Sequence, residues 1–249
     1  MSILLSNDDG ISSPGLTILQ EVLASLDEVW VVAPDRDQSA VSHSLTLQRP
    51  LRIEQVGPRA FAVDGTPTDC INLALNGILR ERPRLVISGI NRGANLGDDI
   101  TYSGTVSAAM EATLLGVPGI ALSLVLYDEC DFTTAADFGR RLAAAVLRDR
   151  LPPDTLLNVN VPGLPAQQVK GFALTRQGKR RYGDAIVEKV DPRGKKYYWI
   201  GGDQLTFVDA EGTDFSAIQR GLISITPLHL DLTNYASLRS LEKLTVQWP

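Results

Sequence analysis

The sequence predicts an α/β fold in which helices cover both faces of a mostly parallel sheet. Through the first 125 residues, short apolar runs typical of buried strands alternate with segments whose apolar residues recur at helical spacing. Strands that alternate with helices of this length are typical of a parallel sheet with helical crossovers. At 249 residues and 44% hydrophobic, the chain is also long and apolar enough to bury a sizeable core.

The first half of the chain supplies these strands and helices in alternation. The expected strands cover residues 3–6, 29–33, 85–88 and 120–124, with extra short strands and turns within 45–63. The expected helices carry their apolar residues within 16–26, 71–79, 106–114 and 135–147. The second of these helices has a clear start, with Thr66 as N-cap, Pro67 at the first helical position and Asp69 in the first turn.

The pattern changes after about residue 150. Residues 156–161 and 222–227 are buried-type strands, and residues 235–244 are expected to form a short terminal helix. Residues 169–175 and 197–200 are also β-like, and two basic turns, 178–183 and 191–196, lie between them. We therefore expect a long hairpin or arm that projects from the core.

The charge of the chain is unevenly distributed. The net charge is −5, yet residues 170–198 hold nine Lys or Arg against three Asp or Glu, which makes this segment +6 and leaves −11 elsewhere. Overall acidity argues against a general nucleic-acid binder, which usually has a basic balance over the whole domain. We expect the basic arm to contact another subunit, and RNA binding through the arm is the alternative.

Two further features bear on the cellular compartment. Cys70 and Cys130 are too few for a disulfide framework and favour a reducing environment. No apolar run approaches the ~20 residues of a membrane span, and the first eight residues lack the basic start and long apolar stretch of a signal peptide. The sequence predicts a cytoplasmic protein with no membrane segment.

Polar residues gather where the expected strands end, which is the edge at which open α/β sheets bind ligands. Asp8 and Asp9 directly follow the first strand. A turn with a helix cap would explain Asn, Asp and Gly in this place. Because two adjacent carboxylates repel each other unless something positive lies between them, a divalent cation or a catalytic role is the favoured interpretation.

The loop after the second strand, residues 34–44, offers hydroxyls and one imidazole. Ser39 is an oxygen donor, although loop serines are usually structural. His43 either contacts a substrate or, as we favour, is a solvated loop residue. Asp35 and Asp37 have the spacing of aspartyl-phosphate phosphatases, but Gln38 follows where that motif has an apolar residue or threonine, so we reject this interpretation.

Two more loops complete the candidate site. Residues 88–97 contain three glycines together with Asn91 and Asn95. The glycines allow unusual backbone angles and the asparagines offer amide oxygens, and a simple connecting loop needs fewer of both. Ser103, Gly104 and Thr105 open the next helix, where free N–H groups and the positive end of the helix dipole suit a phosphate. For Ser103 an N-cap role alone is the alternative.

The donors in these loops are carboxylate, hydroxyl and amide oxygens. Hard oxygen ligands select Mg²⁺ or Mn²⁺, with Ca²⁺ as a further option, over zinc. His43 and His229 form no zinc-type motif, and the role of His229 is left undecided. The chain also lacks a Gly-x-Gly-x-x-Gly after the first strand, a Walker A motif and a Gly-x-Ser-x-Gly elbow.

Three stretches, in this order, closely resemble the stationary-phase survival protein SurE family of 5′-nucleotidases: Ser-Asn-Asp-Asp-Gly-Ile at 6–11, Ser-Gly-Ile-Asn-Arg-Gly-Ala-Asn at 88–95, and Tyr-Ser-Gly-Thr-Val-Ser-Ala-Ala-Met-Glu-Ala at 102–112. Residues 33–42 and 225–228 are similar to that family as well, so the resemblance covers essentially the whole chain. One departure is Ala40, where many members have Gly. This change should alter loop flexibility more than metal binding.

The resemblance implies a metal-dependent phosphatase that hydrolyses nucleoside 5′-monophosphates, with 3′-nucleotides and polyphosphate as further substrates. It implies one divalent cation, Mg²⁺ or Mn²⁺, held by Asp8, Asp9, Ser39 and Asn95, with Asp8 and Asp9 central to catalysis. Phosphate contacts fall on Asn91, Ser103, Gly104 and Thr105. The general acid is left open among Asp8, Asp9, a water molecule and His43, and so is a covalent aspartyl-phosphate on Asp8.

The resemblance also implies a Rossmann-like core, a projecting hairpin, and a C-terminal segment exchanged between subunits of a homodimer or homotetramer. We interpret residues 1–249 as a single domain, with a catalytic core at 1–150 and an extension at 151–249. The rival functional hypothesis is a non-catalytic nucleotide- or RNA-binding protein. A nucleotide-binding module has no use for paired carboxylates, which favours the enzyme.

Overall fold

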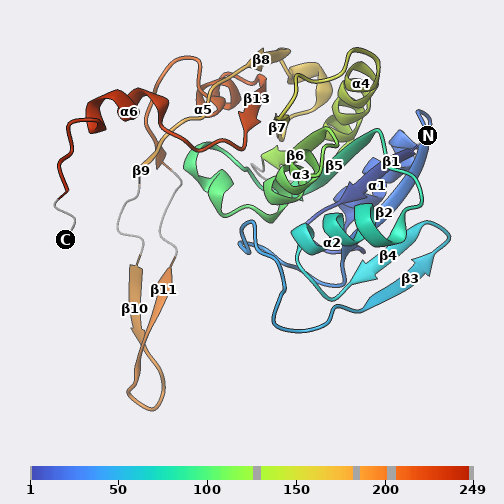
Figure 1. Cartoon of the computed structure of the whole chain (residues 1–249), viewed down its shortest axis with the longest axis horizontal. Helices are drawn as coiled ribbons and strands as arrows, with labels where there is room; N and C mark the ends of the chain where they lie inside the picture. Colours follow the sequence, from blue (N-terminus) through green and yellow to red (C-terminus); the bar gives the residue numbers. More distant parts are fainter. Residues whose placement is uncertain (1, 126–129, 182–185, 201–205, 247–249) are drawn as a thin grey trace.

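The computed structural model describes residues 2–125, 130–181, 186–200 and 206–246, within which nine strands form one sheet with helices on both sides (Figure 1). Their order across the sheet is β3-β4-β2-β1-β5-β6-β7-β13-β8. Neighbouring strands run parallel except that β3 is antiparallel to β4 and β13 is antiparallel to β7. The predicted α/β class, with a mostly parallel sheet, is confirmed.

The strands of this sheet are β1 (Ser2–Ser6), β2 (Glu28–Pro34), β3 (Ile53–Gly57), β4 (Ala60–Val63), β5 (Leu85–Arg92), β6 (Gly119–Val125), β7 (Thr155–Pro162), β8 (Phe172–Leu174) and β13 (Ile223–His229). The helices are α1 (Pro14–Leu23), α2 (Pro67–Leu73), α3 (Gly104–Leu114), α4 (Thr133–Asp149), α5 (Asp214–Gln219) and α6 (Tyr235–Leu241). A π-helical turn, Ala74–Ile78, continues α2, and a 3-10 turn, Gly97–Thr101, precedes α3.

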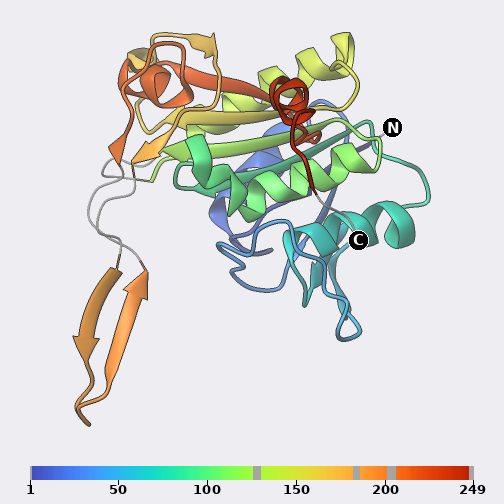
Figure 2. The ribbon, with the colours of Figure 1, turned by 60° about the vertical axis from the view of Figure 1, so that its left-hand side comes forward.

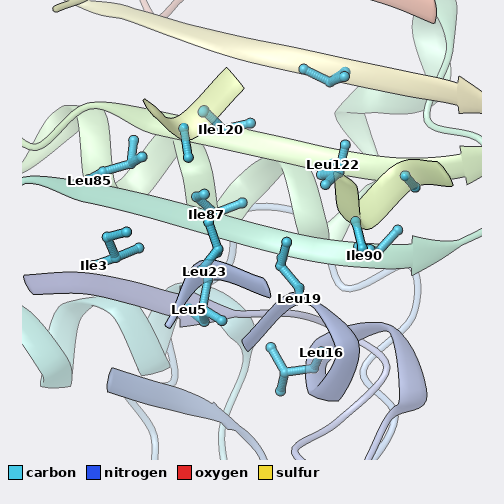
Figure 3. Packing of buried hydrophobic residues seen from close by; sticks show 14 of the residues in the cluster. Ile3, Leu5, Leu16, Leu19, Leu23, Leu85, Ile87, Ile90, Ile120 and Leu122 are labelled. Atoms are coloured by element: carbon cyan, nitrogen blue, oxygen red, sulfur yellow. The ribbon is translucent and has the colours of Figure 1, made fainter. Parts of the chain in front are cut away.

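Each face of the sheet has its own core because successive residues of a strand point to opposite sides. Ile3 and Leu5 of β1 pack on the face covered by α1 and α4, whereas Leu4 packs on the face covered by α2 and α3. Figure 3 shows the first of these cores, in which α1 contributes Leu16, Leu19 and Leu23. These buried strands hold the loops at their carboxyl ends in fixed positions.

The helix start predicted at Thr66 is confirmed in detail. The Thr66 hydroxyl accepts a hydrogen bond from Asp69 N at 3.1 Å, and the Asp69 carboxylate accepts one from Thr66 N at 2.9 Å. This reciprocal capping box satisfies two amides that the first helical turn leaves without partners. Pro67 stands at the first helical position, where its missing N–H is not needed.

The projecting arm forms from different residues than predicted. β10 (Ile186–Val190) and β11 (Lys196–Ile200) pair antiparallel and stand away from the main sheet (Figures 1 and 2). Residues 169–175, expected as an arm strand, instead provide β8, whose backbone pairs with β13 in the main sheet. The basic turn at 191–196 does join the hairpin strands.

The other predicted basic turn, residues 178–183, also differs from expectation. It contains a short strand, β9 (Arg180–Arg181), that pairs antiparallel with β12 (Thr206–Phe207) at the base of the arm. Residues 182 and 183 of this predicted turn lie outside the described residues.

The C-terminal helix is α6, three residues shorter than predicted, and its apolar side chains are exposed. Leu232 before the helix is 94% exposed, and Leu238 and Leu241 on it are more than half exposed. Among the described helices, none is both long and apolar enough to cross a bilayer. Cys70 is a buried free thiol and Cys130 an exposed one, as expected in the absence of a disulfide framework.

Candidate active site

The predicted site loops meet at a topological switch point of the sheet. After β1 the chain crosses to β2 on one side, whereas β5 pairs with β1 on the other side. The loops that follow β1, β2 and β5 therefore leave the sheet at the same edge, next to one another. In open α/β sheets, ligands bind in the crevice that forms at such a point.

Hydrogen bonds join these loops around the paired carboxylates. Gln38 N, from the loop after β2, donates to the backbone oxygen of Asp8 at 2.8 Å. Arg92 N, at the end of β5, donates to Asp9 Oδ2 at 3.2 Å. The hydroxyl of Thr105, from the first turn of α3, donates to Asp8 Oδ1. The four predicted loops thus converge on Asp8 and Asp9.

Asp8 is the most deeply buried of the predicted acidic residues. It is 5% exposed, and among the described residues no Lys, Arg or His forms an ion pair with it. Burial away from water raises the pKa of Asp8 to about 6, because the hydrogen bond from Thr105 opposes this effect only in part and the charge of Asp9 adds to it. A carboxylate in this position favours an added cation.

Gly104 leaves the space that Asp8 occupies against α3. A Cβ at position 104 would lie 2.8 Å from Asp8 Cβ and 3.0 Å from Asp8 Oδ2. Any larger residue would therefore push the carboxylate away from the first turn of α3. Gly104, predicted as a phosphate contact, therefore also has a steric role in the placement of Asp8.

Asp9 is half-buried beside the cleft described below. Burial raises its pKa, while the Arg92 amide lowers it and the nearby charge of Asp37 raises it. Asp37 was not predicted as a site residue. Its negative charge adds to that of Asp8 and Asp9, so this edge of the sheet is strongly acidic.

Asn95 is held in place by a clamp on β7. Its backbone N–H donates to Asn160 Oδ1 at 2.9 Å, and its backbone oxygen accepts from Asn158 and Asn160 at 2.8 and 2.9 Å. Its side-chain Nδ2 donates to Ser123 at 2.8 Å, which fixes the orientation of the amide, so that Oδ1 is the side-chain oxygen that could accept a ligand. Two buried asparagines in an apolar strand were the sequence signal for this clamp.

Two other predicted residues make their hydrogen bonds within their own loops. Asn91 Nδ2 donates to Gly93 O at 3.0 Å, and Ser39 Oγ donates to the Asp37 carboxylate at 2.6 Å. Neither contacts Asp8 or Asp9 through a hydrogen bond. Ser39 is exposed, and Gln38 directly before it is hydrogen-bonded to the backbone oxygen of Asp8.

Ser103 is the N-cap of α3, as its alternative interpretation proposed. Its Oγ accepts from Val106 N at 3.1 Å and its backbone oxygen accepts from the Ser107 hydroxyl at 2.6 Å. Because the side chain acts as an acceptor in the cap, its own proton can still be donated to a ligand.

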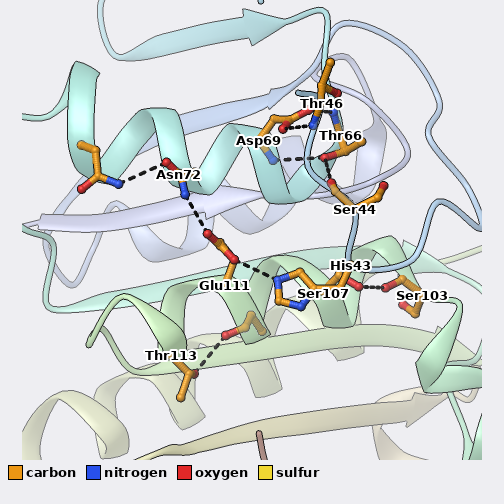
Figure 4. A network of polar contacts seen from close by, with 12 residues as sticks. His43, Ser44, Thr46, Thr66, Asp69, Asn72, Ser103, Ser107, Glu111 and Thr113 are labelled. Carbon is orange, nitrogen blue, oxygen red and sulfur yellow. Dashed lines mark hydrogen bonds and ion pairs between the residues drawn. The ribbon is translucent and has the colours of Figure 1, made fainter. Parts of the chain in front are cut away.

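The two histidines occupy different places. His43 is an exposed loop residue, in line with the favoured interpretation, but it also has a specific partner: its Nε2 lies 2.9 Å from Glu111 Oε2 (Figure 4). His229 is the exposed last residue of β13 and pairs with Thr155 at the start of β7. His229 therefore lies at the edge of the sheet opposite the site.

Asn7 is a site residue that sequence reasoning did not single out. It is fully buried, and its Nδ2 donates to Gly10 O at 2.9 Å and to Ser13 Oγ at 2.6 Å. These bonds shape the turn that carries Asp8 and Asp9. Its Oδ1 is buried without a hydrogen-bond partner among the described residues. An asparagine between a buried strand and the paired carboxylates was the available signal.

The donor set fits a hard divalent cation. Among the described residues, no three His, Cys, Asp or Glu side chains cluster as metal ligands. The predicted set has two carboxylates, and the remaining donors are hydroxyl and amide oxygens of the kind that Mg²⁺ and Mn²⁺ accept. The buried charge of Asp8, without a basic partner, supports the same assignment.

A cleft of about 640 Å³ opens beside Asp9. It is bounded by residues 9–15 and by the side chains of Arg36, Arg92 and Phe132. A hollow of about 690 Å³ between α4 and β8 contains none of the predicted site residues, so the cleft beside Asp9 is the one relevant to chemistry here. Its volume lies in the usual range for small-molecule sites.

Comparison with known proteins agrees with the motifs. The family model described as "Survival protein SurE" matches residues 3–184. The 5'-nucleotidase SurE of Geotalea uraniireducens is 60% identical over 244 residues, covering 98% of both chains. That of Geobacter sulfurreducens is 59% identical over 243 residues, covering 97% of this chain and 93% of its own.

A solved structure is similar over nearly the whole fold. The crystal structure of SurE protein from Aquifex aeolicus superposes with a TM-score of 0.87 at 46% identity, covering 97% of this chain and 98% of that one. The converging loops, the oxygen donor set and these likenesses lead to one conclusion: the chain belongs to the SurE family.

Proposed function

We propose that this protein is a divalent-metal-dependent 5′-nucleotidase, which hydrolyses nucleoside 5′-monophosphates to nucleoside and phosphate. The observation that carries the proposal is the buried Asp8 carboxylate, next to Asp9 and in contact with the first turn of α3. The printed names of the relatives, 5'-nucleotidase SurE, support the same activity. 3′-Nucleotides and polyphosphate are further proposed substrates.

Asp8, Asp9, Ser39 and Asn95 would hold one Mg²⁺ or Mn²⁺. The bound cation would polarise a phosphate oxygen and offset the charge that develops on the phosphoryl group during P–O cleavage. Thr105 keeps Asp8 oriented, and the Asn158–Asn160 clamp keeps Asn95 oriented. The chain thus supplies a prearranged oxygen cage, which lowers the reorganisation needed during reaction.

The first turn of α3 would bind the phosphoryl oxygens. The N–H groups of Gly104 and Thr105 and the spare hydroxyl proton of Ser103 are donors at the positive end of an 11-residue helix. Asn91, at the end of β5, is the proposed fourth phosphate contact. The cleft beside Asp9 would receive the nucleoside, with the Phe132 ring as an apolar wall and Arg92 as a donor.

Water attacks phosphorus in the proposed reaction, the bond from phosphorus to the 5′-oxygen breaks, and that oxygen takes up a proton. Transfer of the phosphoryl group to Asp8 before hydrolysis is the alternative route. Labelled phosphate trapped on Asp8 during turnover would establish that route.

A phosphate-release screen tests the function. Nucleoside 5′- and 3′-monophosphates, sugar phosphates and polyphosphate are each offered with Mg²⁺, Mn²⁺, Ca²⁺ or EDTA. We expect release from 5′-monophosphates with Mg²⁺ or Mn²⁺ and none with EDTA. Binding of nucleotide without any release would identify a non-catalytic nucleotide-binding protein instead.

The basic segment is less available to nucleic acid than its composition indicates. Lys179 forms an ion pair with Asp98 at 2.8 Å, and Arg180 forms one with Asp99 at 2.5 Å. These contacts hold the base of the arm against the 3-10 turn before α3. RNA binding that falls steeply with salt and disappears when Lys179 and Arg180 are neutralised would contradict this interpretation.

The proposal extends to assembly as a homodimer or homotetramer, with residues 1–249 as one domain made of a catalytic core (1–150) and an extension (151–249). The continuous sheet, in which β7 and β13 follow β6, supports the single domain. Exposed apolar residues on the arm and on α6, such as Trp199 and Leu238, support subunit contacts. Sedimentation of the purified protein measures the assembly state.

A further inference from the structure

The loop that carries Ser39, residues 35–48, has an unfavourable backbone. Ala40 has a φ of 59° and Ser42 a φ of 56°, although neither residue is glycine. This left-handed region is disfavoured for residues with a side chain. Two such residues within four positions of Ser39 mean that the loop does not adopt this shape by local preference. Contacts with the rest of the protein must hold it.

The strongest side-chain contact of this loop is with a buried carboxylate on α3. His43 lies 2.9 Å from Glu111 Oε2, and Asn72 of α2 donates to Glu111 Oε1 at 2.8 Å (Figure 4). Glu111 is 6% exposed, and the hydrogen bond from His43 lowers its pKa despite burial. Asn76 donates to Asn72 at 3.2 Å and forms the outer end of this chain.

Three backbone contacts flank the His43–Glu111 pair. Ser42 N donates to Tyr102 O at 3.2 Å, directly before α3. The hydroxyl of Thr66 donates to Ser44 O at 2.7 Å, and Thr46 N donates to Asp69 at 2.9 Å, both at the start of α2. The loop is therefore fastened to the two helices along 42–46.

Ser39 itself lacks such an anchor. Among the described residues its side chain and amide bond only to Asp37, within the same loop. Its position is set by the neighbouring contact of Gln38 with Asp8 and by the anchors that begin at Ser42. Any loss of the later anchors would let the left-handed segment relax and move Ser39 away from the acidic pair.

We propose that Glu111 is a positioning residue for the metal site: through His43 it holds the left-handed loop that presents Ser39 beside Asp8 and Asp9. This inference depends on the proposed metal-dependent function. Glu111 lies seven residues along α3 from Gly104, so it acts through His43 and does not contact the phosphoryl group. The proposed phosphate-binding turn and the residue that holds the loop are thus carried by the same helix, α3.

The Glu111→Gln variant separates the charge from the shape of this residue. The glutamine amide offers one acceptor and one donor end where the two glutamate oxygens accept from His43 and Asn72. The negative charge is then lost, and both contacts are kept only when His43 Nε2 becomes the acceptor. We expect binding of Mn²⁺, measured by electron paramagnetic resonance on the purified protein without substrate, to weaken about 10-fold or more.

A second substitution tests the loop strain directly. In Glu111→Gln, the additional change Ala40→Gly removes the steric penalty for the left-handed backbone. We expect it to restore part of the lost Mn²⁺ affinity. His43→Ala, at a side chain that is 29% exposed, tests the same pair from the loop side if Glu111→Gln folds poorly. Asn76→Ala is the matched control at the outer end of the network and should bind Mn²⁺ within about 2-fold of wild type.

Phosphate release as a function of Mn²⁺ gives a second readout. The variants should need more Mn²⁺ but approach the wild-type kcat at saturating metal. Unchanged Mn²⁺ affinity in both Glu111→Gln and His43→Ala, with wild-type binding intact, would show that the pair only stabilises the fold. A wild-type protein that binds no Mn²⁺ would overturn the metal-dependent function itself.

Discussion

Two buried carboxylates, Asp8 and Asp214, differ in the number of hydrogen bonds that their oxygens accept. Asp214 is fully buried at the junction with the extension, and its oxygens accept from the amides of Gly97, Gly178 and Phe215 at 2.8–2.9 Å. Asp8 receives one side-chain hydrogen bond, from Thr105, with smaller contributions from its own amide and that of Thr105.

This difference supports a structural role for Asp214 and the proposed metal-ligand role for Asp8. The carboxylate of Asp214 accepts hydrogen bonds from three backbone amides of the fold, so the residue ties the loop after β5 to α5 and to Gly178. The charge of Asp8 is left for a partner from outside. Burial alone therefore does not distinguish the proposed ligand Asp8 from a structural carboxylate; the two differ in how many hydrogen bonds their oxygens accept.

The largest effect is expected at Asp8. Asp8→Asn removes one of the two charges that would hold the cation, so phosphate release should fall on the order of 10²–10³-fold. The free energy of unfolding in EDTA should not decrease, because the variant no longer buries a poorly compensated charge. Activity assays and denaturant unfolding of the same preparation measure both. A strongly destabilised Asp8→Asn protein would remove the distinction between the two carboxylates.

Asp214→Ala should show the reverse pattern. The substitution leaves three amides without their acceptor, and hydrogen bonds to a charged group are among the stronger ones in proteins. We expect a loss of about 3 kcal/mol in unfolding free energy, with residual activity in the fraction that stays folded. Thermal and denaturant unfolding test this. Wild-type stability in Asp214→Ala would mean that water replaces the lost acceptor.

Gly104→Ala tests whether Asp8 needs its position as well as its charge. The added Cβ would lie 2.8 Å from Asp8 Cβ, so the carboxylate must shift. Activity should fall roughly 10–100-fold while stability changes by less than about 1 kcal/mol, because alanine is a better helix former than glycine. Gly77→Ala is the matched control, since a Cβ there meets nothing within 4 Å.

The elements and residues that could be predicted from the sequence are those with a local sequence signal. The strands β1, β2, β5, β6 and β7 were predicted because they are buried on both faces and read as continuous apolar runs. Asp8 and Asp9 were found because adjacent carboxylates at a strand end are unusual. β10 was missed because an exposed two-stranded hairpin packs on no core and leaves no burial pattern.

The remaining features depend on contacts between distant segments. His43 and Glu111 are 68 residues apart, and Gly97 and Asp214 are 117 apart. Neither pair has a local signature: Glu111 sits in a helix whose other residues are nearly all buried, and Asp214 follows an ordinary N-cap threonine. Residues 169–175 became β8 because β13 offered an unpaired edge, which only the assembled sheet reveals.

The smallest effect is a pH dependence that belongs to Asp214. Burial raises its pKa above the ordinary 3.8 even though backbone amides, those of Gly97, Phe215 and Gly178 among them, lower it. The folded state then binds a proton more tightly than the unfolded state does, so this group contributes stability that is complete below pH 3.8 and is lost as pH rises through the raised pKa.

The Asp214→Asn variant tests this dependence because its side chain cannot titrate. The stability of the wild type relative to this variant should therefore decline as pH rises from below 3.8 toward neutrality, as measured by denaturant unfolding across that range. A difference that stays constant, or grows with pH, would show that the three amides outweigh burial and that Asp214 is compensated more completely than its surroundings indicate.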